Sequence, residues 1–161
     1  MNTIPAIIDD ALRLVPAPVA VIGVAREGAL GGLTAAWLTR VSMDPPLLLV
    51  SIGHERHTYE LMRSGTSFSV SLLHEGQVEI ARLFGLHSGR ERAKWAEVAH
   101  ELLDDGTPVV ADCSAQFHCR TVQRMAAGDH DLFIGEVVGA RIIAGGPALP
   151  LRGADYAPRT E

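Results

Sequence analysis

The chain has 161 residues, a length that fits one domain with its own hydrophobic core, and we expect a single domain over residues 1–161. Apolar residues make up 47% and charged residues 20% of the sequence, which excludes a disordered chain. Fourteen basic and nineteen acidic side chains give a net charge of −5, so no overall positive field exists to hold nucleic acid.

The sequence carries no pattern typical of a membrane or secreted protein. The longest apolar run, residues 45–52, is shorter than the roughly 20 residues that span a bilayer. Asp9 and Asp10 stand near the N-terminus, where a secretory signal has a basic segment. We therefore expect no membrane span and a cytoplasmic location. Cys113 and Cys119, about 20 Å apart if they share one strand, are expected to be reduced core residues.

A short helix is predicted to open the chain, and a series of short strands to follow. Thr3 can cap this helix, Pro5 suits its first turn, and its apolar face is expected to lie on the body of the domain. Glycines within residues 28–32 predict a hairpin turn. Apolar runs bounded by turn-forming residues predict strands at residues 18–25, 33–42, 47–52 and 67–73.

The second half of the sequence predicts further helices and a long hairpin. Helical spacing is found at residues 58–62 and 77–84, and the polar region 85–99 is expected on the surface, leading into a helix over residues 92–102. Residues 115–120 alternate between apolar and polar, which is typical of a half-buried strand. Segments 113–125 and 132–143 flank a Gly-Asp turn and predict a hairpin. At least six strands with few helices favour an antiparallel barrel.

Several common functional motifs are absent or wrongly spaced. The sequence has no GxGxxG, GxxxxGK[ST] or GxSxG pattern. In the stretch His-Glu-Arg-His at residues 54–57 the second histidine falls one position too early for a zinc-binding helix, and His118 and Cys119 point to opposite sides of a strand. No metal site is expected. Asp129-His130-Asp131 fits either a surface turn, which local pattern favours, or part of a catalytic group.

Four segments in a fixed order carry a resemblance to a known family. GGLTAAWLTRVSMDPPLLLVSI at residues 31–52 combines a small, hydroxylated strand with Ser-x-Asp-Pro-Pro and an apolar strand. Segments 55–73, 81–95 and 127–142 follow with a Thr-containing helix start, a Phe-Gly pair before a lysine, and Gly-Asp-His before Phe-x-Gly-Glu-Val. Together they resemble the flavin reductase-like, FMN-binding split-barrel family over about residues 15–145. The resemblance implies a mainly β fold, an antiparallel split barrel with a few short helices.

The resemblance also implies a site for flavin mononucleotide (FMN), with FAD as the alternative, and NAD(P)H as electron donor. His130 matches the family's Gly-Asp-His histidine and is the candidate catalytic residue, as a contact on the flavin or nicotinamide side. The candidate cofactor-binding residues are Thr34, Ala35, Ala36, Trp37, Ser51, Ile52, Arg56, His57, Thr58, Phe84, Gly85 and Lys94.

The chemistry of these residues suits a flavin site at each end, and each group of residues also has a purely structural interpretation. Ala35 and Ala36 are small enough to bring backbone groups to the pyrimidine edge of a flavin, although small strand residues also serve packing. The helix start at residues 56–58 offers a guanidinium, a hydroxyl and free N–H groups to a phosphate, or is a solvated cap. Trp37 borders the flavin or a subunit contact, or anchors the core.

A second basic cluster comprises Arg90, Arg92 and Lys94, and Lys94 is the only lysine of the chain. Lys94 also matches the family's lysine position, which makes it the stronger phosphate candidate. Two departures from the family affect the substrate side more than the cofactor side. Ala93 replaces a frequent aspartate, and Leu151 stands where an aromatic residue commonly precedes Arg-Gly.

The expected function is that of an NAD(P)H:flavin oxidoreductase. It binds FMN and transfers hydride from NAD(P)H to flavin, supplying reduced flavin or electrons to a partner oxygenase or another acceptor. The resemblance implies a homodimer with each flavin near the subunit interface. The alternative is a non-enzymatic FMN-binding electron carrier or flavin-dependent sensor. A pyridoxamine-phosphate oxidase type of enzyme is a third possibility, without a specific substrate-phosphate motif to support it.

Overall fold

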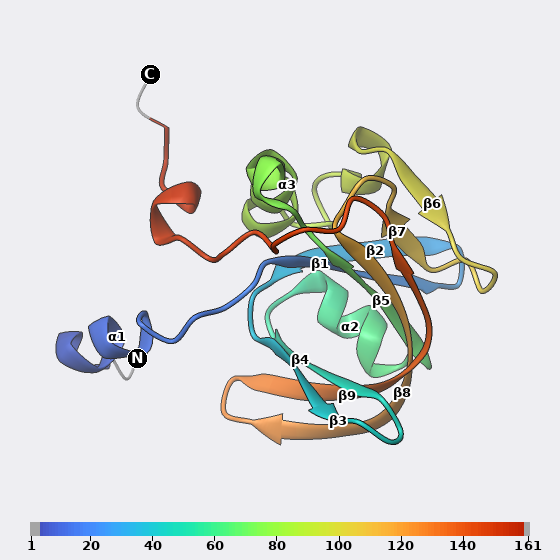
Figure 1. Cartoon of the computed structure of the whole chain (residues 1–161), viewed down its shortest axis with the longest axis horizontal. Coiled ribbons are helices and arrows are strands. Elements are labelled where there is room, and N and C mark those ends of the chain that lie inside the picture. Colours follow the sequence, from blue (N-terminus) through green and yellow to red (C-terminus); the bar gives the residue numbers. More distant parts are fainter. Residues whose placement is uncertain (1–3, 160–161) are drawn as a thin grey trace.

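The computed structural model describes residues 4–159 (Figure 1). Its main element is a seven-stranded antiparallel sheet in the order β2-β1-β5-β8-β9-β4-β3, and β6 and β7 form a separate small sheet. The strands of the large sheet are β1 Ala20–Arg26, β2 Ala29–Ala35, β3 Leu38–Ser42, β4 Leu47–Gly53, β5 Ser67–Leu72, β8 Ala115–Ala127 and β9 His130–Ile142. The small sheet comprises β6 His100–Leu102 and β7 Pro108–Val110.

Short helices accompany the sheet. They are α1 Ala6–Leu12, α2 His57–Arg63 and α3 Val78–Leu86, with 3-10 turns η1 Glu75–Gln77, η2 Lys94–Glu97 and η3 Gly153–Tyr156. Figure 1 shows the sheet curling around α2, with β1 and β5 on one side and β3, β4 and β9 on the other. The fold is a mainly β, antiparallel split barrel, as the resemblance implied. No helix within residues 4–159 combines the length and the apolar character needed to cross a membrane.

The sheet buries apolar side chains on both faces. Ile22 of β1, Met62 of α2, Phe68 of β5 and Phe133 of β9 belong to one core cluster inside the curl. Val21, which points to the opposite face of β1, belongs to a second cluster with α3 and η2. Two layers of core therefore share β1, and the second layer carries the wall of the cleft described below.

The predicted strand over residues 33–42 is two strands. Ala35 at the end of β2 pairs with Ala20, whereas Leu38 at the start of β3 pairs with Val50. These two strands form opposite edges of the large sheet, so the residues between them carry the chain from one edge to the other. The Ser51 N–H donates to the Trp37 carbonyl at 2.9 Å and fixes this crossing. Continuous alternation in the sequence does not reveal such a change of partner.

The predicted helix over residues 92–102 is wrong, and the region before it is only partly on the surface. One 3-10 turn, η2, buries Lys94 and Trp95, each with 5% of its surface exposed. The Trp95 Nε1–H donates to the Gly31 carbonyl at 2.9 Å, and after η2 the chain becomes extended to pair with β7. Tertiary contacts outweigh the helical spacing here.

The opening helix is present as α1, but its predicted packing is wrong. Pro5 takes the N-cap position, and the predicted cap Thr3 lies outside the described residues. None of the residues of α1 is buried, and Ile7 is 75% exposed. Figure 1 shows α1 extending away from the sheet. Helical spacing predicts an apolar face correctly, yet it cannot say what covers that face.

The alternation over residues 115–120 is also interrupted in β8. Gln116 is buried, because its side-chain amide donates to the Val110 carbonyl at 2.8 Å, while Phe117 is half-buried. A register shift between His118 and Cys119 then moves the following residues relative to β9. The other predicted strands, the helices at 58–62 and 77–84 and the β8–β9 hairpin are confirmed. Cys113 and Cys119 are free and buried.

Candidate functional site

A cleft of about 430 Å³ opens beside the second core layer. Its walls are the start of α2, the end of α3, η2 and the loop between α3 and η2, and β2 forms its floor. The cleft is lined by Gly32, Leu33, Glu55, Arg56, His57, Thr58, Phe84, Leu86, His87, Ser88, Gly89, Arg90, Glu91 and Lys94. Five of the predicted cofactor-binding residues therefore meet in one cleft, namely Arg56, His57, Thr58, Phe84 and Lys94.

Lys94 is a buried cation in the wall of this cleft. Its Nζ donates to the His87 carbonyl at 2.8 Å and to the Phe84 carbonyl at 3.3 Å, and lies 5.3 Å from the centre of the Phe84 ring. Within residues 4–159 no carboxylate forms an ion pair with it. Because an ammonium group has three N–H donors, one remains for a ligand in the cleft.

The electrostatics of Lys94 suit an anion. Burial lowers the pKa of Lys94 to about 8, and the nearby positive charge of Arg56 lowers it further in the same direction. A buried charge without a counter-ion is costly, and a bound anion relieves that cost. The cleft therefore favours a ligand with a negatively charged group next to Lys94.

We expect the affinity for an anionic ligand to depend on pH through Lys94. Below about pH 8 the ammonium is charged and attracts the anion; above it the free protein loses the proton, while the anion holds it in the complex. The dissociation constant for FMN should be flat between about pH 7 and 8 and rise by up to about tenfold per pH unit above 8. Fluorescence titration at several pH values measures this. A constant affinity across pH 8 would contradict it.

The arginines near Lys94 differ from it in their partners and in their position relative to the cleft. The Arg56 Nη1–H donates to the Gly85 carbonyl at 3.2 Å, which joins the start of α2 to the end of α3. Arg90 pairs with Glu60 at 2.5 Å, and Arg92 lies outside the cleft and pairs with Glu97. Of the second predicted basic cluster, Lys94 alone is thus a buried cation in the cleft wall without a carboxylate partner in the described part of the chain.

His57 and Thr58 occupy the first turn of α2. The Nδ1 atom of His57 is buried and has no hydrogen-bond partner in the described structure, although Glu60 Oε2 lies 3.7 Å away. Thr58 is buried, and its hydroxyl lies close to the backbone at Gly31. The first turn of α2 thus lines the cleft with His57 and Thr58 and contains one buried nitrogen without a hydrogen-bond partner in the described structure.

The predicted residues of β2 and β4 extend the site beyond the cleft. Thr34 donates from its hydroxyl to the Ala81 carbonyl at 2.7 Å and lies against Gly85. The side chains of Ala35 and Ile52 are buried, so these two residues can meet a cofactor only through their backbone. Ala36 lies at the crossing between β2 and β3, and Ser51 of β4 is joined to this crossing because its N–H donates to the Trp37 carbonyl.

Trp37 and His130 form an exposed aromatic pair at the other end of this surface. Their rings lie 4.9 Å apart, and Trp37 is 60% exposed, so its predicted alternative as a core anchor is wrong. His130 Nδ1 lies 2.6 Å from Asp129 Oδ1, and its ring lies beside Gly53. Gly53 in turn adjoins Arg56, so the pair and the cleft are neighbours. Asp129 lies in an exposed turn, as the local sequence pattern favoured, and its carboxylate contacts the neighbouring His130 ring.

A polar cluster around Asp131 was not predicted. Asp131 is 6% exposed; its Oδ1 lies 2.8 Å from His54 Nε2, and its Oδ2 accepts from the Tyr59 hydroxyl at 3.0 Å. Arg124 Nε lies 3.6 Å from the same carboxylate. The available signal was strand alternation, which places Asp131 on the face opposite to His130. This cluster fixes the start of β9 and with it the position of His130.

We expect Asp131→Asn to lower the free energy of unfolding by about 1–3 kcal/mol, because hydrogen bonds to a charged carboxylate are lost inside the protein. Hydrogen bonds from His54 and Tyr59 hold the pKa of Asp131 below its ordinary value, so the stabilisation is present above that value and lost as pH falls through the folded pKa. Urea denaturation measures the effect. The control Asp129→Asn, at an exposed turn position, should leave the stability unchanged; equal stability of both variants would contradict the account.

Within residues 4–159, no three His, Cys, Asp or Glu side chains gather in a way that can hold a metal ion. His54 contacts Asp131 and Tyr59, and His57 lies near Glu60. The two histidines of the segment at residues 54–57 therefore take part in separate interactions. The fold and the site together define the class of this protein as a split barrel with a cleft beside it that has a buried lysine in its wall.

Comparison with known proteins narrows this class to a family. The family model described as flavin reductase like domain matches residues 12–157. The NADH:riboflavin 5'-phosphate oxidoreductase of Streptomyces pristinaespiralis is 35% identical over 149 residues, which are 88% of this chain and 78% of that protein. The chain belongs to the flavin reductase like domain family.

Solved structures agree with this assignment. An FMN-binding protein from Thermus thermophilus, with bound 1-cyclohex-2-enone, is 31% identical, covers 92% of both chains and has a TM-score of 0.81. The NADH:FAD oxidoreductase of Streptomyces globisporus is 28% identical, with 95% of this chain and 93% of that chain covered and a TM-score of 0.82. An uncharacterized protein of Aeropyrum pernix is 36% identical over 135 residues, and this chain spans only 51% of its length.

Proposed function

We propose that this protein is an NAD(P)H:flavin oxidoreductase that binds FMN in the cleft beside Lys94. The observation that carries the proposal is a buried ammonium without a carboxylate partner in the described structure, in a chain of the flavin reductase like domain family. A phosphate supplies the missing negative charge. Relatives named as NADH-dependent flavin oxidoreductases support the same activity.

The residues present fit FMN. Lys94 and Arg56 supply cationic donors for the phosphate, and the floor of the cleft at Gly32 and Leu33 is backbone and apolar surface. The small side chains of Ala35 and Ala36 allow backbone groups to approach the polar edge of a flavin ring. FMN rather than FAD is the proposed cofactor, since one phosphate matches one buried cation.

When bound, FMN supplies the ability to accept a hydride from NAD(P)H and to pass the electrons on. The protein's part is to position and to exclude water. Lys94 and Arg56 would hold the phosphate end, and the backbone groups of the crossing at Ala36 and Trp37 would be available to the ring. Asp129 holds His130 by Nδ1, which leaves Nε2 free for a contact on the flavin or nicotinamide side. Hydride transfer itself needs no side-chain acid or base.

The test of the activity is steady-state consumption of NADH and of NADPH, each with and without added FMN or FAD. We expect consumption that depends on added or bound flavin, and the faster nicotinamide identifies the donor. Protein that consumes neither donor with either flavin would overturn the proposed activity.

An FMN-binding electron carrier is the second candidate. A flavoredoxin from Methanosarcina acetivorans is 26% identical with a TM-score of 0.76, and a high molecular weight rubredoxin of Moorella thermoacetica is 32% identical over 120 residues. Protein that keeps FMN through gel filtration but consumes neither NADH nor NADPH supports this candidate against the first.

A homodimer and a cytoplasmic location are part of the proposal. Several large apolar side chains on or beside β3, β8 and β9 are exposed, namely Trp37, Val41, Met43, Val122, Met125 and Val138. Exposed apolar surface of this kind suits a second copy of the chain. Two free cysteines fit a reducing compartment. Sedimentation velocity should give a dimer mass; a monomer at micromolar concentration would contradict the dimer.

A further inference from the structure

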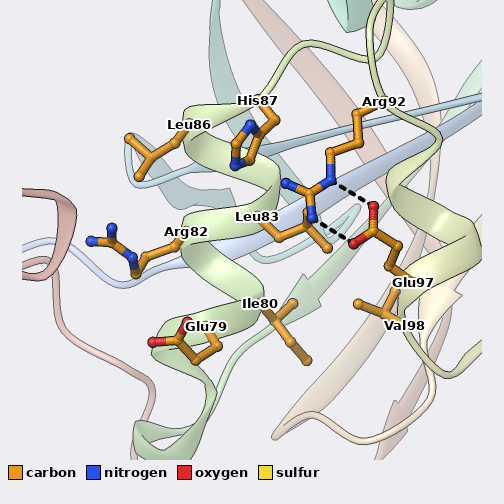
Figure 2. A pocket seen from close by; sticks show the side chains of 9 residues that line it. All are labelled: Glu79, Ile80, Arg82, Leu83, Leu86, His87, Arg92, Glu97 and Val98. Carbon is orange, nitrogen blue, oxygen red and sulfur yellow. Dashed lines mark hydrogen bonds and ion pairs between the residues drawn. The ribbon is translucent and has the colours of Figure 1, made fainter. Parts of the chain in front are cut away.

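The loop between α3 and η2, residues 88–91, has a hollow on each side. Its four residues line the cleft. The residues that flank it, His87 and Arg92, line a second pocket of about 340 Å³. Figure 2 shows this pocket between α3, which carries Ile80 and Leu83, and the segment that carries the Arg92–Glu97 pair. The loop therefore has little packed protein beside it.

The backbone of this loop is bonded mainly to itself. In the described structure the N–H groups of Glu91 and Arg92 donate to the Ser88 carbonyl, and the Arg90 N–H donates to the Ser88 hydroxyl. Ser88 is half-buried, and the other three residues of the loop are exposed. A segment with local hydrogen bonds and little buried surface opens at low cost in free energy. Side-chain contacts therefore decide whether the loop stays closed.

Glu60 of α2 makes a side-chain contact with this loop. Its Oε1 accepts a hydrogen bond from Arg90 Nη2 at 2.5 Å, and its Oε2 lies 3.7 Å from His57 Nδ1. The His57 ring in turn lies against the loop, because a Cβ atom at Gly89 would be 3.0 Å from His57 Cδ2. Arg90, Gly89 and His57 line the cleft, whereas Glu60 does not. Glu60 thus acts on the cleft through its neighbours.

The loop lies next to the end of the cleft that suits a phosphate. The His87 carbonyl, directly before the loop, accepts from the Lys94 ammonium at 2.8 Å, and Lys94 lines the same cleft as the loop. We propose that Glu60 is a positioning residue that keeps the 88–91 loop closed over this end and slows the exchange of FMN. The inference rests on the proposed function, since it concerns the release of the ligand proposed for that site.

The strength of the contact indicates how far it restrains the loop. The side chains of Arg90 and Glu60 are both about half exposed, and exposed ion pairs contribute little to stability. The closed position is therefore favoured only modestly, and the loop opens often enough to exchange flavin. Glu60 sets the rate of this exchange.

Glu60→Gln tests the proposal by the sign of its effect. It removes the charge that holds Arg90 and keeps the size of the side chain. The association and release rate constants for FMN should both rise, by about two- to fivefold, because the loop opens more often. If Glu60 acted only through its charge, the loss of a carboxylate near the cleft would favour the anion and slow its release. Stopped-flow mixing of apoprotein with FMN, followed by flavin fluorescence, gives both rate constants.

The matched control is Glu97→Gln. Glu97 also pairs with an arginine, Arg92, but lines the second pocket and not the cleft, so both rate constants should stay unchanged. A double-mutant cycle adds Arg90→Gln. In that background Glu60→Gln should cause no further acceleration, because the contact is already lost. Circular dichroism and urea denaturation establish that each variant is folded.

Three results would overturn the role of Glu60. They are unchanged or slower release in Glu60→Gln, an equal acceleration in Glu97→Gln, and an acceleration by Glu60→Gln that persists when Arg90 is already replaced. An unsubstituted protein that binds no FMN would overturn the proposed function itself, so the two failures are distinguishable.

Discussion

Lys94→Met should weaken FMN binding by about 10- to 100-fold. A charge-assisted hydrogen bond from a buried group contributes about 1.5–3 kcal/mol, and each 1.4 kcal/mol corresponds to a tenfold change in the dissociation constant. The substitution keeps the aliphatic part of the side chain over Phe84, so it removes mainly the charge and the donors. Equilibrium titration of apoprotein with FMN, followed by flavin fluorescence, measures the change.

The control for this variant is Arg120→Met. Arg120 is exposed, pairs with Glu136 on the β8–β9 hairpin and does not line the cleft, so its loss should leave the FMN affinity unchanged. The pH dependence of the FMN affinity distinguishes phosphate binding by Lys94 from a purely structural role. The affinity of the Lys94→Met variant should no longer fall above pH 8, since the titrating group is absent. Equal affinities of the variant and the unsubstituted protein would contradict phosphate binding by Lys94.

Phe84→Ala should have the largest effect on stability, a loss of about 3–5 kcal/mol in the free energy of unfolding. Phe84 has no exposed surface, packs against Trp95 with ring centres 4.7 Å apart, and lies beneath the Lys94 ammonium. Its removal leaves a cavity in the second core layer and takes away the floor under Lys94. Urea denaturation measures the stability, and FMN titration of the folded fraction measures the accompanying loss of affinity.

Leu12→Ala is the matched control, because Leu12 is also a helical apolar residue but is 58% exposed on α1. The free energy of unfolding of the Leu12→Ala variant should change by less than about 0.5 kcal/mol. Phe84→Leu, which leaves a smaller cavity, should lose less than Phe84→Ala in the same direction. A Phe84→Ala variant as stable as Leu12→Ala would show that the second core layer does not support the cleft.

Local sequence patterns predicted most of the sheet. Half-buried strands show an alternation of apolar and polar residues, and turns show turn-forming residues such as Gly and Asp. The β8–β9 hairpin follows from alternating segments around a Gly-Asp turn, and Gly128 has the positive φ that such a turn requires. The patterns failed where distant contacts decide the conformation. Trp95 bonds to Gly31, 64 positions earlier in the sequence, and this contact replaces a predicted helix with one 3-10 turn.

The candidate site was predicted in part, through family resemblance rather than through residue chemistry alone. The resemblance chose Lys94, but the sequence does not show that its ammonium is buried or that its described partners are two carbonyl groups. The cluster of His54, Tyr59 and Asp131 was missed, because Asp131 lies 77 and 72 positions from its two partners. Such distant side-chain contacts become visible only when the register between β4 and β9 is known.

The second pocket was also beyond prediction. Ile80 and Leu83 show ordinary helical spacing in the sequence, which indicates a buried face of α3. Whether such a face is covered or borders a pocket depends on the conformation of η2, and the predicted helix at that place was wrong. The error at residues 92–102 thus concealed both the burial of Lys94 and the pocket beside it.

The most direct test of the proposed function is anaerobic reduction of the protein loaded with FMN. Free flavin is removed by gel filtration, NADH or NADPH is added without oxygen, and the visible absorbance band of the flavin is followed. We expect the band to bleach rapidly with at least one of the two donors, and more slowly, at equal flavin concentration, in the absence of protein. Protein that retains FMN whose band persists with both donors would contradict the oxidoreductase and support an electron carrier.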